Sequence, residues 1–144
     1  MTEKLLLETL DEFASRRVVA DLWLRDDDAT QPTEKLERLL ALSSEFSVPV
    51  TLAVIPEPTG EELAKRLNVT NNIDVAVHGS AHRNHATSAE KKRELGLHRP
   101  LKTVMDDLAR GFDKLKALHC ENFVPMLVPP WNRIDDEIVA ELRR

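Results

Sequence analysis

Four apolar runs rich in β-branched residues alternate with helical patterns, and this alternation limits the possible folds more than any other feature of the chain. The runs cover residues 18–24, 48–55, 73–77 and 123–128. Between them, apolar residues recur at helical spacing, most clearly over residues 101–118. Strands joined by helices pair in parallel, because each helix returns the chain to the same end of the sheet. The alternation predicts an α/β fold with mainly parallel strands.

Local signals also mark where several helices begin. Residues 2–15 form an amphipathic pattern. Thr33 precedes the helix expected after the first strand, and Thr59 with Glu62 has the spacing of a capping box. At 144 residues the chain is long enough to bury a core, and we expect a single domain, residues 1–144.

The charge balance argues against a nucleic-acid partner, because 20 basic residues face 25 acidic ones and no basic block occurs. The charged segment 90–94 is expected to be solvated surface. The amino-terminal apolar run is only three leucines long, so we expect no membrane span. The single cysteine, Cys120, excludes an internal disulfide and indicates the reducing environment of the cytoplasm.

Three polar motifs follow predicted strands. The acidic run 26–28 follows the first strand, His78 and His82 follow the third, and residues 129–131, Pro-Pro-Trp, follow the fourth. Ligands of parallel α/β folds gather outside the carboxyl ends of the strands. Because parallel neighbouring strands end at the same edge of the sheet, we expect these motifs to meet there.

Together these motifs suggest a metal site. On a helical turn, His78 and His82 would share one face, four positions apart. A histidine pair alone arises easily by chance, so the hypothesis needs a third ligand, which the acidic run 26–28 supplies. Two imidazoles and one carboxylate suit a divalent ion such as zinc and leave a position open for water. A second aspartate of the run could act as a general base.

The ordered motifs LRDDDAT, HGSAH and LVPPW, between Arg25 and Trp131, resemble those of the polysaccharide deacetylase family, the carbohydrate esterases of family 4 with the NodB-homology fold. The resemblance implies a partial or distorted (β/α) barrel. It also implies a metal-dependent hydrolase that removes an acyl group, mostly acetyl, from N- or O-acetylated sugar-like substrates. The implied cofactor is a divalent metal, with Zn²⁺ as the favoured ion. The implied partner is a small-molecule or carbohydrate substrate.

The same resemblance assigns roles to the polar residues. His78 and His82 match the two metal-binding histidines. The closest ungapped match of the first motif makes Asp27 the general base and Asp28 the third metal ligand. A shift of one residue would instead make Asp26 the base and Asp27 the ligand. Asp27 is functional in both registers.

The third motif matches only in part. Pro130 and Trp131 are implied to bind substrate, because the aromatic residue of this motif lines the substrate groove in the family. The family usually begins the motif with an arginine that orients the base, and here Val128 occupies that position. Arg25 and Arg133 are the candidates to replace it.

The family's later motifs, which supply an acetyl pocket and a histidine acid, find no match before Arg144. At about 30 residues per βα unit, the chain makes four or five units, so we expect a domain that is incomplete at its carboxyl end. His85, His98 and His119 remain candidates for the acid. The alternative functions are a non-catalytic metal- or ligand-binding homologue and an inactive fragment of the fold. An open sheet edge also predicts a possible homodimer.

Overall fold

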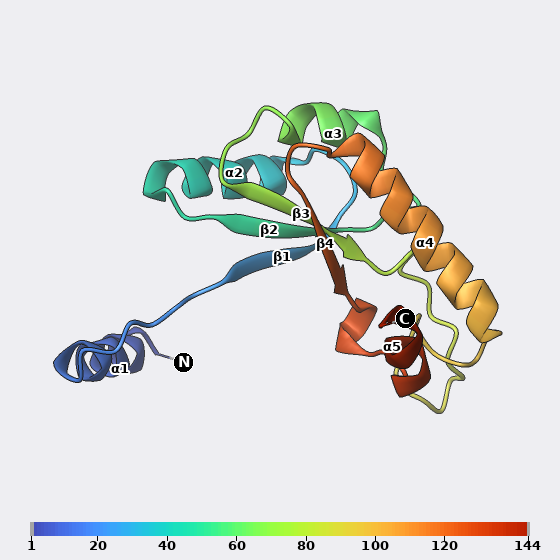
Figure 1. Cartoon of the computed structure of the whole chain (residues 1–144). Coiled ribbons are helices and arrows are strands. Elements are labelled where there is room, and N and C mark those ends of the chain that lie inside the picture. The colour runs from blue at the N-terminus through green and yellow to red at the C-terminus, as the bar shows by residue number, and fades with distance from the viewer. Residues whose placement is uncertain (1, 144) are drawn as a thin grey trace.

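A computed structural model describes residues 2–143 (Figure 1). The elements are, in chain order, α1 (Glu3–Ser15), β1 (Leu24–Ala29), α2 (Glu34–Phe46), β2 (Val50–Val54), α3 (Glu61–Leu67), β3 (Ile73–His78), α4 (Leu101–Leu118), β4 (Phe123–Val128), the 3₁₀ helix η1 (Pro130–Asn132) and α5 (Asp136–Leu142). The four strands form one sheet in the order β1-β2-β3-β4, and every neighbouring pair is parallel. The predicted α/β fold with a parallel sheet is confirmed.

One face of the sheet is covered by helices and holds the main core. A single apolar cluster joins the helices α2, α3 and α4 to the central strands β2 and β3. Figure 1 shows these helices packed along the sheet. The buried members of this cluster are Leu36, Leu40, Val50, Leu52, Val54, Leu63, Leu67, Ile73, Val75, Val77 and Leu115. Burying such side chains contributes about 1.5–3 kcal/mol each. This face therefore anchors the strands that carry the polar motifs.

The opposite face of the sheet carries small residues. The register aligns Asp27 of β1 with Ala53 of β2, and Ala53 with Ala76 of β3. Ala53 and Ala76 pack with Val128 of β4 in a separate small cluster. Side chains alternate along a strand, so His78 lies on this same face, two residues beyond Ala76. Asp27 and His78 are thus placed over one surface of the sheet.

The first strand is displaced from its predicted position. We expected it over residues 18–24, but β1 begins at Leu24, where pairing with Val50 starts. Val19 and Leu22 are each 82% exposed, because the sheet offers them no neighbouring strand. As a result, the acidic run lies within the carboxyl-terminal half of β1 and not after it.

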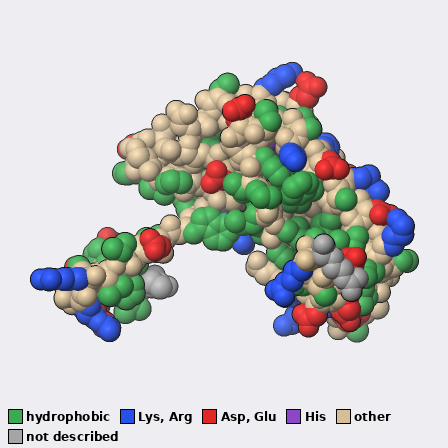
Figure 2. Space-filling model, in the orientation of Figure 1, with side chains coloured by type: hydrophobic (Ala, Val, Ile, Leu, Met, Phe, Trp, Pro, Cys, Tyr) green, Lys and Arg blue, Asp and Glu red, His purple; other side chains and the backbone are tan. Residues whose placement is uncertain are grey.

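The helix starts were predicted with mixed success. The Thr33 side chain accepts the N–H of Leu36 at 3.1 Å and caps α2, as expected. The capping box at Thr59 is wrong, since α3 is preceded by Gly60 and receives no side-chain cap. α1 extends away from the sheet, and none of the side chains of its residues 3–15 is buried (Figures 1 and 2). Within residues 2–143, no helix is both long and apolar enough to cross a membrane.

Candidate metal centre

A bulge in β1 directs Asp28 toward the histidines. The pairing with β2 slips between Asp27 and Ala29, and Asp28 adopts a left-handed backbone conformation with φ +72°. Such a bulge bends the strand and re-aims one side chain. Oδ1 of Asp28 lies 3.1 Å from Nε2 of His78 and 3.3 Å from Nε2 of His82. One carboxylate oxygen therefore faces both imidazoles.

The backbone of β4 holds His78 in place. His78 is the last residue of β3 and is 2% exposed. Its Nδ1 lies 3.0 Å from the carbonyl oxygen of Val128. A carbonyl accepts only from a protonated nitrogen, so Nδ1 carries a proton, which leaves Nε2 as the ring nitrogen that could bind a metal. Val128, which stands where the third motif of the deacetylase family usually has an arginine, thus contributes through its main chain.

His82 reaches the site through an irregular loop. Gly79 has φ +59° and His82 has φ +55°, so residues 79–82 do not form the helical turn that we expected. The two histidine ring centroids are 5.1 Å apart. The helical prediction was wrong because two residues of this segment are left-handed. The spacing of the histidines along the chain carries no information about the tertiary contacts that hold them so.

The three side chains fit a divalent metal. Among the described residues, Asp28, His78 and His82 form a group whose ligand atoms lie within 4.8 Å of one another. Zinc bound tetrahedrally at about 2.0–2.1 Å places its ligand atoms about 3.3 Å apart, and both Asp-to-His separations are close to this value. The Asp28 side chain is 61% exposed, so solvent and substrate can approach. The donor set of two nitrogens and one oxygen suits zinc and other divalent ions.

Arg25 pairs with Asp27 beside this group. Nε of Arg25 lies 2.7 Å from Oδ1 of Asp27 in an ion pair, and Nη2 donates to Oδ2 at 3.0 Å. Nη2 also reaches Oδ1 of Asn132 at 3.5 Å. Arg133, the other candidate, instead donates to the carbonyl of Lys92 at 3.2 Å. Of the two arginines, Arg25 is therefore the one that contacts the aspartate.

Asp26 lies on the other face of β1. Side chains of β1 alternate, which places Arg25 and Asp27 together and Asp26 opposite them. All three aspartates border a cavity of about 460 Å³ next to α2, so the assignment of Asp26 to the other face rests on the alternation of side chains along β1. Partial burial raises the pKa of Asp26, and the neighbouring carboxylates raise it further. This arrangement favours the ungapped match of the first motif over the register shifted by one residue.

The third motif closes one side of the group. The ring centroid of Trp131 lies 4.3 Å from that of His82, with the planes tilted by 49°. Trp131 has φ +53° and the next residue, Asn132, has φ +54°, so the chain turns sharply here. Pro130 is buried, and its ring lies against Gly79. The indole therefore lies beside the ligand His82, whereas Pro130 lies beneath the loop.

Glu94 and Asn132 are two site residues that sequence reasoning missed. The expectation that residues 90–94 are solvated is wrong for Glu94, which is 1% exposed and binds the backbone of the histidine loop. Neither residue carries a local signal, since their partners lie elsewhere in the chain. For Asn132, its position directly after the Pro-Pro-Trp motif was the available hint.

The three candidate acid histidines lie apart from the Asp-His-His group. His119 is fully buried between α4 and the amino end of β4, and burial lowers its pKa. His98 pairs with Glu90 at 3.2 Å on the surface. The backbone N–H of His85 donates to the carbonyl of Arg93 at 2.9 Å, and partial burial lowers the pKa of His85. None of these contacts reaches the three ligands.

Asp28, His78 and His82 thus converge at the carboxyl edge of a parallel sheet. Neither a protein-family model nor a curated protein sequence matches the chain. Solved structures do match. The peptidoglycan deacetylase PdaC from Bacillus subtilis aligns with TM-score 0.61 and 15% identity over 84% of this chain and 54% of that one.

Two further solved structures agree. The T48 deacetylase with substrate aligns with TM-score 0.53 and 17% identity over 78% of this chain and 50% of that one. A CE4 esterase of Streptococcus mutans aligns with TM-score 0.58 and 14% identity over 83% and 52%. The chain has the NodB-type fold of the family 4 deacetylases, as a partial distorted barrel, and spans about half the length of these proteins.

Proposed function

We propose that this protein is a metal-dependent hydrolase that removes an acetyl or related acyl group from an N- or O-acetylated sugar-like substrate. The observation that carries the proposal is the position of Asp28 Oδ1, within 3.3 Å of Nε2 of both His78 and His82. The fold shared with three deacetylase structures supports the same reaction class. The proposed metal is Zn²⁺.

Each polar residue of the site has a distinct task in this proposal. Asp28, His78 and His82 would hold the ion, which when bound polarises the acyl carbonyl and lowers the pKa of a water molecule toward about 7. Asp27 would accept the proton of the attacking water on a carboxylate oxygen. Arg25, paired with that carboxylate at 2.7 Å, would hold it in one orientation.

The proposed substrate is a small acetylated carbohydrate. Trp131 would pack against a sugar ring, because its indole lies beside His82 and large aromatic faces suit the apolar faces of sugars. Pro130 would contribute to the same groove by supporting this turn. The structural match to a peptidoglycan deacetylase supports a carbohydrate. We also propose a cytoplasmic location, which rests only on the single cysteine.

Acetate release tests the proposal directly. The purified protein, loaded with Zn²⁺, is incubated with N-acetylglucosamine oligomers and with O-acetylated sugars. Wild type should release acetate, and Asp27→Asn should lose about 10²–10⁴-fold in rate while binding the same amount of metal. Asp26→Asn is the matched control and should keep both. Loss of turnover in Asp26→Asn with its metal retained, together with loss of bound metal in Asp27→Asn, would assign the base to the shifted register.

A second candidate function is a non-catalytic metal-binding homologue. Two observations favour it: Val128 occupies the usual arginine position, and none of His85, His98 and His119 contacts the three ligands. This function predicts wild-type protein that binds one equivalent of Zn²⁺ and releases no acetate from any substrate of the panel. The inactive-fragment alternative predicts the absence of both properties.

A further inference from the structure

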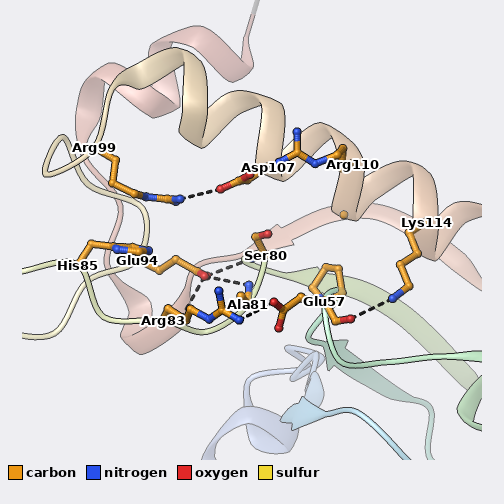
Figure 3. Close-up of a pocket in the computed structure, with 12 residues that line it drawn as sticks. Glu57, Ser80, Ala81, Arg83, His85, Glu94, Arg99, Asp107, Arg110 and Lys114 are labelled. Atoms are coloured by element: carbon orange, nitrogen blue, oxygen red, sulfur yellow. Dashed lines mark hydrogen bonds and ion pairs between the residues drawn. The ribbon is translucent and has the colours of Figure 1, made fainter.

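Glu94 is buried although it belongs to a charged segment. It is 1% exposed, and its carboxylate accepts three backbone N–H groups of the loop after β3 (Figure 3). Oε2 accepts from Ser80 at 3.0 Å. Oε1 accepts from Ala81 at 2.9 Å and from Arg83 at 3.1 Å. A buried carboxylate is costly unless it is hydrogen-bonded, and these N–H groups supply the bonds.

The loop has the shape of an anion-binding nest. Gly79 and His82 are both left-handed, with φ +59° and +55°, and successive N–H groups around such residues converge on one anion. Here the anion is supplied by the chain itself, from Glu94. The loop and the carboxylate therefore stabilise each other.

The contacts of Glu94 bear directly on His82. Ala81 and Arg83, the two neighbours of His82, donate to the same oxygen of Glu94. His82 is thus held between two fixed amides, and its Nε2 lies 3.3 Å from Oδ1 of Asp28.

Gly79 completes the same arrangement. A Cβ atom at Gly79 would lie 2.1 Å from Oε2 of Glu94 and 2.5 Å from Cγ of Pro130. The backbone between the two histidine ligands is therefore enclosed by Glu94 on one side and by the Pro-Pro-Trp turn on the other. Only glycine allows this approach.

We propose that Glu94 is a positioning residue for the metal centre. Its carboxylate holds residues 79–83 in the conformation that points His82 at Asp28 before a metal binds. The inference rests on the metal site of the proposed function. Groups that orient metal ligands from outside the coordination sphere typically change metal affinity about 10–100-fold when they are mutated.

The test is a Co²⁺ titration of metal-free protein, followed by visible absorption at a temperature where circular dichroism shows each variant folded. In Glu94→Gln the amide nitrogen cannot accept an N–H, so we expect about 10-fold or weaker Co²⁺ binding and an altered absorption band. The matched control is Asp135→Asn. Asp135 lies just before α5 and accepts the N–H of Leu97 at 2.8 Å. Leu97 belongs to the later part of the loop between β3 and α4, and Asp135 also pairs with Arg93 of that loop.

A metal-free readout separates positioning from metal binding. Amide hydrogen exchange of Ala81 and Arg83 should be slow in metal-free wild type and at least about 10-fold faster in E94Q, while Asp135→Asn leaves both amides protected. If E94Q does not fold, Glu94→Asp takes its place, since its carboxylate is one methylene shorter. Unchanged affinity and unchanged exchange in that variant overturn the proposal.

The remaining outcomes are also decisive. If wild type binds Co²⁺ and E94Q binds it equally well, Glu94 does not position the site. Equal weakening in E94Q and Asp135→Asn means a general loss of stability and likewise overturns the proposal. If wild type fails to bind Co²⁺, the proposed metal function fails, and the exchange of Ala81 and Arg83 still decides whether Glu94 orders the loop.

Discussion

Oδ1 of Asp28 lies 3.1 Å from Nε2 of His78, although the two side chains come from strands that do not pair with each other. β2 separates them, and the bulge at Asp28 brings the carboxylate across the end of β2. A bulge leaves its extra residue free of the strand ladder. The distortion of β1 therefore aims at His78 a carboxylate that a regular strand would direct elsewhere.

Replacing this carboxylate should abolish metal binding. Asp28→Asn removes the anionic ligand and keeps the shape of the side chain, so we expect Zn²⁺ affinity to fall by more than about 100-fold, a larger loss than residues outside the coordination sphere produce. Isothermal titration of metal-free protein measures the change. Asp26→Asn, on the other face of β1, serves as control and should bind normally. Equal affinity of the two variants would contradict the site.

Arg25 should matter for turnover and not for metal content. Arg25→Lys keeps the charge but cannot form the paired contact with Asp27, so the base loses its orientation. We expect kcat for acetate release to fall by about 10-fold or more with zinc content unchanged. The control is Arg133→Lys, because the side chain of Arg133 donates to the carbonyl of Lys92 and not to Asp27. A loss in the control variant alone would make Arg133 the orienting residue.

The strand and helix order could be predicted because local composition and periodicity determine it. β2 is fully buried, β3 is buried except at Asp74, all six residues of β4 are apolar, and α4 carries a clear apolar stripe. Once the sheet is parallel, the carboxyl ends of its strands share an edge, so the sequence already places His78 and the acidic run near the same edge.

The remaining features depend on contacts between distant segments. β1 starts at Leu24 because pairing with Val50 starts there, and the preceding apolar residues gave no sign of this limit. The left-handed backbone of Asp28 follows from the bulge and not from the preferences of aspartate alone. Glu94 looks like a surface residue because the amides that bind it belong to an earlier loop.

Gly79 should tolerate no side chain. A Cβ atom would lie 2.1 Å from Glu94 Oε2, and φ +59° is strained for other residues. Each effect costs about 1–3 kcal/mol, so Gly79→Ala should lower the free energy of unfolding by about 2–6 kcal/mol. Urea denaturation measures it. Gly60→Ala is the control, since nothing lies within 4 Å of its Cβ position, and it should change stability by less than about 1 kcal/mol.

The homodimer expected from the open sheet stays a prediction. α1 exposes Leu5, Leu6 and Leu7 by 52%, 41% and 55%. Figure 2 shows hydrophobic side chains on the surface of this helix. An amphipathic helix of this length is only marginally stable in water without a packing partner. Sedimentation at micromolar concentrations should show a dimer that Leu5→Lys with Leu7→Lys dissociates. A wild-type monomer over this range would contradict the prediction.

His119 should make the fold sensitive to mild acid. It is fully buried, neither ring nitrogen has a hydrogen-bond partner among the described residues, and burial lowers its pKa below 6.5. The unfolded chain therefore binds a proton more readily than the folded one as pH falls below about 6.5, so the free energy of unfolding decreases, by at most about 1.4 kcal/mol per pH unit for this group.

The change should flatten again below the folded-state pKa, where both states are protonated. Urea denaturation of metal-free protein at several pH values from about 7.5 to about 5 measures how steeply the free energy of unfolding depends on pH. His119→Leu should reduce this slope, because it removes the proton-binding group from both states. Glu90, whose pKa is lowered to about 2, stays ionised in this range and does not interfere. An identical slope in His119→Leu would assign the acid sensitivity to other groups, of which His85 has its pKa lowered by burial and by Arg99.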